Sequence, residues 1–182
     1  LMTFNGDVRN TADIQAWMGE IEANQGRLDV LVNNVGDFLF LVKPLEKMSD
    51  EDIDNLMSVN LRHIMITSRE ALPLMKASGG GGSIIAISSV EGFRGMPNIT
   101  PYGAANAGVT GFAQSLALEV GKDNIRVNVI APETTETEQV RPADLMTPED
   151  YQRQTQWLPL GRFGQPKDTA GCALFLASDL SA

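Results

Sequence analysis

Short apolar runs alternate with longer segments of helical periodicity along most of this chain. The apolar runs cover residues 28–33, 83–88 and 125–131. Runs of this kind are typical of parallel strands that are covered on both faces. The helical segments cover residues 13–25, 50–76, 102–121 and 166–178. The alternation predicts an α/β fold, a Rossmann-like doubly wound parallel sheet with helices on both faces.

The length of the chain fits one domain. With 182 residues, of which 43% are hydrophobic and 20% are charged, the chain can bury a substantial core. It contains no internal repeat and no interior linker, so residues 1–182 are expected to form a single domain. Residues 1–8 are expected to form part of a further strand.

Charge and composition exclude several kinds of partner. The formal net charge is −9, whereas nucleic acid and anionic membranes reward clusters of lysine and arginine, so neither partner is expected. No apolar segment reaches the roughly 18 residues that can cross a bilayer. The amino terminus also lacks a basic segment that leads into an apolar one. We therefore expect a cytoplasmic protein.

The single cysteine and the single histidine predict neither a disulfide nor a metal site. Cys172 lies in the apolar run 172–176 and is expected to be a buried structural thiol. One cysteine cannot form an internal disulfide, which fits a reducing compartment. His63 has no partner at a metal-ligand spacing, so we expect it at the surface or at a boundary, with no metal bound.

Polar residues and a glycine follow the predicted strands, where an open α/β sheet binds its ligands. Asn33, Asn34 and Gly36 come at the end of the first apolar run. Gly36 has no side chain, so the backbone there can approach a ligand closely. Ser88 and Ser89 come at the end of the second run. The carboxyl edge of the sheet is therefore the predicted site.

A serine and a tyrosine are spaced so that they could polarise and protonate a carbonyl. Tyr102 follows Ser89 by thirteen residues, and Asn106 follows Tyr102 by four. Four residues make about one helical turn, so Tyr102 and Asn106 are expected on the same face of a helix. A phenol has an ordinary pKa of about 10. Proton transfer near neutral pH therefore needs a nearby cation, which an amide cannot supply.

In these motifs the chain resembles the short-chain dehydrogenase/reductase family, including members similar to 3-oxoacyl-ACP reductases. The matching segments are Asp7-Val8, Asn33-Asn34-Val35-Gly36, Val59-Asn60-Leu61, Ser89 with Tyr102, residues 128–133 and residues 161–168. The resemblance implies an oxidoreductase that interconverts a secondary alcohol and a ketone by hydride transfer. It implies NAD or NADP as the cofactor, a small-molecule alcohol or ketone as the substrate, and a homodimer or homotetramer.

The same resemblance implies a role for individual residues. Ser89 would hydrogen-bond the substrate oxygen, Tyr102 would transfer the proton, and Asn60 would hold a water in the proton path. The implied catalytic residues are Asn60, Ser89, Tyr102 and Asn106. The implied cofactor-binding residues are Asp7, Val8, Asn34, Val35, Gly36, Tyr102, Asn106, Pro132, Thr135 and Thr137. The loop of residues 138–160 corresponds to the family's substrate lid.

Two positions depart from the family's pattern. Asn106 stands where the family has a lysine, which should lower the rate roughly 10²-fold or more if proton transfer limits the reaction. Glu133 stands where the family has a glycine, and its charge should weaken pyrophosphate binding if it faces the site. In the family a glycine-rich turn and two strands would precede Leu1 and a last strand would follow Ala182. The sheet is therefore expected to be incomplete at both ends.

Two functions from different classes fit this pattern. The first is an NAD(P)-dependent alcohol dehydrogenase or carbonyl reductase whose activity is impaired by Asn106. The second is a non-catalytic protein of the same fold that acts in binding or assembly. The substitution Asn106→Lys distinguishes them, because it should raise the reductase rate only of an impaired enzyme.

Overall fold

Three parallel strands form the sheet, in the order in which they occur along the chain. The structure is a computed structural model that describes residues 1–138 and 140–182. The strands are β1 (Val30–Asn33), β2 (Gly82–Ile87) and β3 (Ile125–Ile130). Val30 pairs with Ser83 in β2, and Gly82 pairs with Ile125 in β3. The three predicted strands are confirmed, and their carboxyl ends lie at one edge of the sheet.

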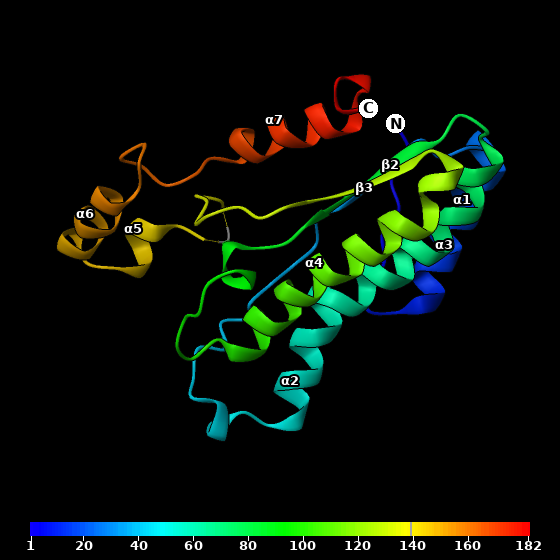
Figure 1. The fold of residues 1–182 in the computed structure, drawn as a ribbon. Helices are drawn as coiled ribbons and strands as arrows, with labels where there is room; N and C mark the ends of the chain where they lie inside the picture. Colours follow the sequence, from blue (N-terminus) through cyan, green and yellow to red (C-terminus); the bar gives the residue numbers. More distant parts are fainter. Residues whose placement is uncertain (139) are drawn as a thin grey trace.

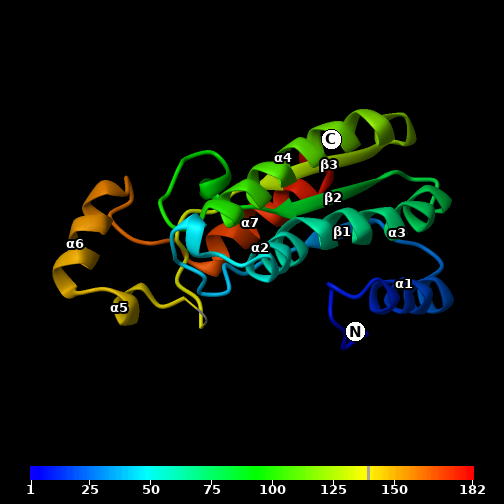
Figure 2. The same cartoon turned by 90° about the horizontal axis from the view of Figure 1, so that it is seen from below.

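Helices cover both faces of this sheet, as the alternation predicts. The α-helices are α1 (Thr11–Gln25), α2 (Asp50–Met57), α3 (His63–Ala77), α4 (Thr100–Val120), α5 (Pro142–Leu145), α6 (Pro148–Trp157) and α7 (Pro166–Ala177). Helices α1, α3 and α4 lie on one side of the strands and α7 lies on the other (Figures 1 and 2). The doubly wound α/β arrangement is therefore present, with a sheet of three strands.

The main core lies between the sheet and the α1, α3 and α4 layer. Its central side chains include Ile84 of β2 and Ile125 of β3, with Met75 of α3 and Val120 of α4 packed against them. All four are at most 2% exposed. Burial of such side chains is worth about 1.5–3 kcal/mol each. This packing holds the strand ends, and so the predicted site, in fixed positions.

The predicted helix over residues 50–76 is divided by a short π-helical segment. Helix α2 begins with a capping box, in which Ser49 accepts from the amide of Asp52 and the Asp52 carboxylate accepts from the amide of Ser49. After α2 comes the π-helix η2 (Ser58–Arg62), which contains Asn60 and leads directly into α3. Single π-helical turns inside helices are rare and are frequent at functional sites.

The expected strand at residues 1–8 is wrong. Residues 1–7 have no regular secondary structure, because no described neighbour supplies a strand ladder for them. The amide of Asp7 instead donates to the Asp13 carboxylate at the start of α1, at 2.8 Å. A strand needs a hydrogen-bonding neighbour as well as apolar residues, and only the second condition can be read from this segment.

Two short helices lie within the loop of residues 138–160, of which Gln139 lies outside the described residues. Helices α5 and α6 both carry a proline in their first turn, and Thr147 caps α6 by accepting from the amide of Asp150. Proline and a threonine cap are ordinary signals for a helix start. These helices project away from the sheet (Figure 1).

Helix α7 is attached to the sheet by polar bonds to its last turn. The Ser83 hydroxyl donates to the Leu176 carbonyl at 2.8 Å, and Arg126 donates to the same carbonyl at 2.9 Å. No residue of α7 is fully buried. The prediction that Cys172 is buried is therefore wrong, since this thiol lies exposed in α7.

Candidate active site

The carboxyl ends of the three strands bring the predicted site residues to one edge of the sheet. Asn34, Val35 and Gly36 follow β1, and Ser88 and Ser89 follow β2. The predicted positions after β3 are Pro132, Thr135 and Thr137. This edge is where open α/β sheets bind ligands.

Ser89 begins the 3-10 turn η3 (Val90–Gly92) at the end of β2. Its hydroxyl oxygen accepts from the amide of Glu91 at 3.2 Å. That bond uses a lone pair of the oxygen, so the hydroxyl hydrogen can still be donated to a ligand. Ser88, in contrast, donates from its hydroxyl to the Asn106 carbonyl at 3.0 Å and is buried. Ser88 therefore has a structural bond, whereas Ser89 is half-buried at the edge.

The turn that carries Ser89 packs directly on the first turns of α4, where Tyr102 lies. A Cβ added to Gly92 would come within 2.8 Å of the carbonyl carbon of Asn106. A Cβ added to Gly103 would come within 3.1 Å of the carbonyl oxygen of Glu91. The two glycines allow this close approach of two backbones. The structure therefore brings the Ser89 turn and the half-buried Tyr102 together.

Asn106 is fixed inside α4. Its amide Nδ2 donates to the Tyr102 carbonyl at 2.9 Å, one turn earlier, and the residue is 4% exposed. This bond lies on the same helix face as Tyr102, as the spacing predicts. The side chain is neutral, so position 106 places no positive charge beside the Tyr102 side chain.

Asn60 joins the π-helix η2 to the loop that follows β1. Its Nδ2 donates to the Asp37 carbonyl at 2.7 Å and to the Leu56 carbonyl at 2.9 Å. Its Oδ1 accepts from the Asp37 amide at 3.0 Å. A Cβ at Gly36 would lie 3.2 Å from the same Oδ1. Buried Asn60 therefore fixes the backbone just after Gly36, a contact that the sequence does not reveal.

Five of the expected cofactor-binding residues line one cleft. This open cleft of about 920 Å³ is bordered by Asp7, Val8, Asn34, Val35 and Gly36. The Asp7 carboxylate pairs with Arg9 at 2.6 Å. The hydrogen bonds from the Arg9 side chain lower the pKa of Asp7 to about 2. The cleft therefore has an ionised carboxylate and a guanidinium in its lining.

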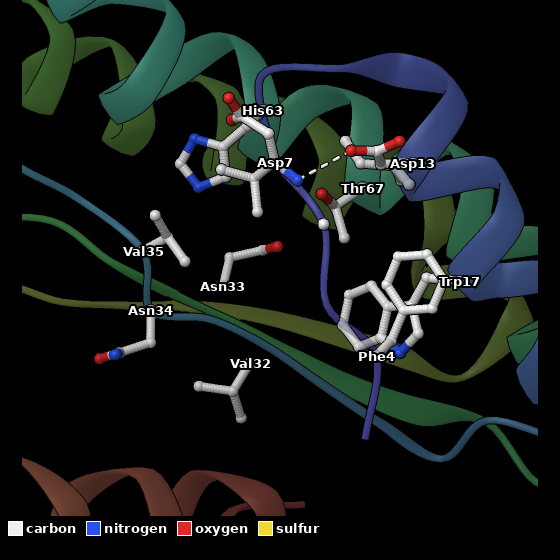
Figure 3. A pocket seen from close by; sticks show the side chains of 13 residues that line it. Phe4, Asp7, Asp13, Trp17, Val32, Asn33, Asn34, Val35, His63 and Thr67 are labelled. Carbon is white, nitrogen blue, oxygen red and sulfur yellow. Dashed lines mark hydrogen bonds between the residues drawn. The ribbon is translucent and has the colours of Figure 1, made fainter. Parts of the chain in front are cut away.

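A smaller pocket of about 270 Å³ adjoins this cleft (Figure 3). Phe4 and Trp17 border it on one side and His63 borders it on the other. The side chains of Asn33 and Asn34 point to opposite sides of the strand end. Asn33 is buried and donates to the Ser68 hydroxyl at 3.4 Å, so it has a structural contact, while Asn34 is exposed.

The prediction that His63 lies at the surface or a boundary is wrong. The imidazole is 2% exposed, and neither ring nitrogen has a well-formed hydrogen bond within the described residues. Burial lowers the pKa of His63, with the nearby backbone of Ser58 and Val35 opposing that shift. His63 begins α3 directly after the π-helix η2.

The loop after β3 is held by its own turns and by the Ser89 turn. The Pro132 carbonyl accepts from the Val90 amide at 3.2 Å, which continues the pairing of β2 with β3. The Thr135 hydroxyl donates to the Glu133 carbonyl at 2.8 Å, and the Thr137 hydroxyl accepts from the Val140 amide at 3.0 Å. Pro132, Thr135 and Thr137 therefore lie at the site edge, in a loop separate from the cleft beside β1.

Glu133 has a partner that the sequence does not reveal. Both of its carboxylate oxygens accept from the Arg94 guanidinium, at 2.7 and 2.9 Å. Burial raises the pKa of Glu133, but the amide of Thr134 and the Arg94 guanidinium outweigh this and hold the pKa below its usual value. Arg94 lies thirty-nine residues earlier in the chain, beyond the reach of any local pattern.

Among residues 1–138 and 140–182, no group of three or more His, Cys, Asp or Glu side chains is arranged to hold a metal ion. No helix in the same described segments is long and apolar enough to span a bilayer.

Comparison with known proteins gives one consistent family. The family model for enoyl-(acyl carrier protein) reductase matches residues 2–182. The chain is 39% identical over 183 residues to 3-oxoacyl-[acyl-carrier-protein] reductase FabG of Chlamydia trachomatis, covering 97% of this chain and 68% of that protein. It is 41% identical over 173 residues to carbonyl reductase family member 4 of Xenopus laevis, covering 93% and 68% respectively.

A solved structure agrees with these relatives. The crystal structure of a candidate short-chain alcohol dehydrogenase from Sinorhizobium meliloti 1021 matches with a TM-score of 0.88 and 32% identity. The match covers 98% of this chain and 69% of that chain. The similarity therefore extends over nearly every element described above.

Proposed function

Because the chain belongs to the short-chain dehydrogenase/reductase family, whose members use NAD(P), we propose that it interconverts a secondary alcohol and a ketone. One observation carries this proposal. The turn that bears Ser89 packs against the turns of α4 that bear Tyr102 and Asn106, at the ligand-binding edge of the sheet. A serine and a tyrosine held together there can act on one carbonyl oxygen.

Each of these two residues has a defined part in the proposed reaction. The Ser89 hydroxyl donates a hydrogen bond to the substrate oxygen, because its acceptor bond from Glu91 leaves the hydrogen free to be donated. The Tyr102 hydroxyl gives a proton to that oxygen in reduction and takes it back in oxidation. When bound, NAD(P) supplies or accepts the hydride.

The residues present fit such a cofactor on the β1 side of the site. The open cleft there has room for part of a dinucleotide, and the missing side chain at Gly36 leaves its backbone accessible. Asp7 and Val8 would hold the adenine end, and Asn34, Val35 and Gly36 would line the same cofactor cleft. Pro132, Thr135 and Thr137 would hold the nicotinamide end, and Tyr102 and Asn106 would contact its ribose.

Asn106 is the reason to propose a slow enzyme. A cation near a tyrosine favours its ionised form, which assists proton transfer near neutral pH. The buried, neutral Asn106 amide instead bonds the Tyr102 carbonyl. We expect a rate roughly 10²-fold below that of a variant with a cation at this position. We also propose that Asn60 holds a water in the proton path, while its side chain fixes the loop after Gly36.

The bond between the neutral Asn106 side chain and the Tyr102 carbonyl also favours a second function, that of a non-catalytic protein that acts in binding or assembly. The Nδ2 of Asn106 is engaged within its own helix, which would suit a fold that has lost its chemistry. In either function we propose a homodimer or homotetramer, as the family resemblance implies, located in the cytoplasm. For the enzyme, the proposed substrate is a small alcohol or ketone.

A rate measurement with matched variants tests the enzyme. Oxidation of NADH and NADPH would be followed with a 3-oxoacyl thioester, a simple ketone and a sugar-derived ketone, using the full-length protein. We expect a slow rate with at least one ketone, a loss of about 10²-fold in Ser89→Ala or Tyr102→Phe, and no change in Ser115→Ala, which alters an exposed serine of α4. Equal rates in Tyr102→Phe and the unaltered protein would overturn the proposed chemistry.

A further inference from the structure

The Arg94 guanidinium bridges two carboxylates from two different strand-end loops. Its Nε and Nη2 donate to Oε1 of Glu91 at 3.1 and 2.8 Å. Its Nη1 and Nη2 donate to the two oxygens of Glu133 at 2.7 and 2.9 Å. Glu91 belongs to the Ser89 turn and Glu133 to the loop after β3. One arginine therefore joins the two loops that border the proposed site.

The Glu91 side of this bridge is closely packed. The Glu91 side chain is 11% exposed, and its second oxygen, Oε2, is buried with no hydrogen-bond partner in the described chain. The Arg94 amide donates to the Val90 carbonyl at 3.1 Å, which fixes the backbone of the arginine on the same turn. A carboxylate in such a place needs its cation, because removal of the cation leaves a charge with little solvent.

The Glu133 side of the bridge lies in the loop that would hold the nicotinamide end of the dinucleotide. Glu133 follows β3 at the carboxyl edge of the sheet, and its side chain is 31% exposed. The Thr134 amide also donates to its Oε1 at 2.8 Å, so the carboxylate is charged and fixed in direction. A dinucleotide carries a negatively charged pyrophosphate, and a like charge near it weakens binding.

We propose that Arg94 is a positioning residue that lets Glu133 occupy this edge without repelling the dinucleotide. Its guanidinium offsets the negative charge of Glu133 and directs that carboxylate toward the Ser89 turn. The inference rests on the proposed function, because it takes NAD(P) as the ligand.

Binding of NADH and NADPH, measured by fluorescence titration of the full-length protein, tests this role without any need for turnover. We expect Arg94→Ala to raise the Kd of the dinucleotide about tenfold, because it exposes the charge of Glu133. The second change in Arg94→Ala/Glu133→Gln removes that charge, so the Kd should return to within about threefold of the unaltered protein. Arg94→Lys should retain most of the affinity.

A matched control removes an arginine far from the site. Arg27 pairs with Asp29 at 2.6 Å just before β1, at the opposite edge of the sheet. Arg27→Ala changes the net charge equally and should leave the Kd unchanged. Thermal unfolding of each variant would show that the protein remains folded.

Two results would overturn the inference alone. They are an Arg94→Ala variant that binds as tightly as the unaltered protein, and an Arg94→Ala/Glu133→Gln variant that binds no better than Arg94→Ala. The second result would mean that Arg94 only stabilises the loops. If the unaltered protein binds neither dinucleotide, the inference and the proposed function both fail.

Discussion

Gly92 lies against Asn106 so closely that a Cβ on the glycine would come within 2.8 Å of the Asn106 carbonyl carbon. The turn after β2 and the helix α4 are therefore in backbone contact at the proposed site. This contact holds the turn that bears Ser89 against the helix that bears Tyr102. Any side chain at position 92 must push the two apart or shift the turn, since the contacted atoms belong to a helix backbone.

Gly92→Ala is expected to destabilise the protein by about 1–3 kcal/mol and to lower the reductase rate, because overpacking displaces the Ser89 turn. Gly95→Ala is the matched control, since a Cβ at Gly95 would meet nothing within 4 Å. Urea unfolding and NADPH oxidation would be measured for both variants. If Gly92→Ala and Gly95→Ala have the same urea midpoint and the same rate of NADPH oxidation, the contact does not position Ser89.

Asn60→Ala is expected to lower the free energy of unfolding by about 1–3 kcal/mol, because it removes two hydrogen bonds to the half-buried backbone of Asp37 and one to the buried Leu56 carbonyl. The exposed Asn24 makes a similar bond to a carbonyl one turn earlier, that of Glu20, at 2.7 Å. Asn24→Ala should therefore lower the free energy of unfolding by much less. Urea midpoints of the two variants would be compared, and a smaller effect at Asn60 than at Asn24 would contradict this account of its role.

Asp52→Asn is expected to lower the melting temperature at neutral pH, with the loss disappearing in acid. The hydrogen bond from Lys43, followed by those from the Ser49 amide and hydroxyl, lowers the pKa of Asp52 to about 2, from an ordinary 3.8. A lowered folded pKa stabilises the protein above the unfolded value, and the stabilisation is lost as the pH falls through about 2. Circular dichroism between pH 7 and pH 2 would measure the difference.

The control for that prediction is Asp54→Asn, which alters an exposed aspartate on the same helix. Its melting temperature should stay close to that of the unaltered protein at neutral pH. A difference between Asp52→Asn and the unaltered protein that persists undiminished at pH 2 would show that the ionised carboxylate is not what stabilises α2.

His63 should make the protein less stable as the solution is acidified. Burial holds the folded pKa of His63 below its ordinary value of 6.5. The unfolded chain therefore takes up a proton that the folded one resists, so stability falls as the pH drops below about 6.5. His63→Leu should lose that part of the pH dependence. Urea midpoints at pH 7.5 and 5.5 would test this, and an equal acid loss in both proteins would contradict it.

The sequence was sufficient for the strands and the main helices because their signals are local. An apolar run bounded by polar residues predicts β2, and the Ser49 cap predicts the start of α2. Signals that depend on a distant neighbour were missed. The segment of residues 1–8 has strand composition but no described strand to pair with, and Cys172 sits in an apolar run on a helix that leaves it exposed.

At the candidate site too, local signals could be read from the sequence, whereas contacts between distant residues could not. Strand ends predict that Ser89 and Gly36 lie at the carboxyl edge. Tyr102 lies on a helix, and its role is implied by its spacing from Ser89 and by the family resemblance. The Arg94 partner of Glu133 and the Asp37 contact of Asn60 join residues far apart in the chain, so neither could be predicted from local patterns. The sequence marks Glu133 as a departure from the family's pattern, but only the structure shows that its charge is paired.

The most direct test of the account is the reductase rate of Asn106→Lys in the full-length protein, compared with Asn106→Met and Asn106→Lys/Tyr102→Phe. Methionine matches the length of lysine without its charge. We predict a gain of roughly 10²-fold in Asn106→Lys alone, which is lost when Tyr102 is also changed. A folded, cofactor-binding Asn106→Lys protein with no gain in rate would contradict the claim that the Ser89 and Tyr102 site is an intact reductase centre that lacks only its cation.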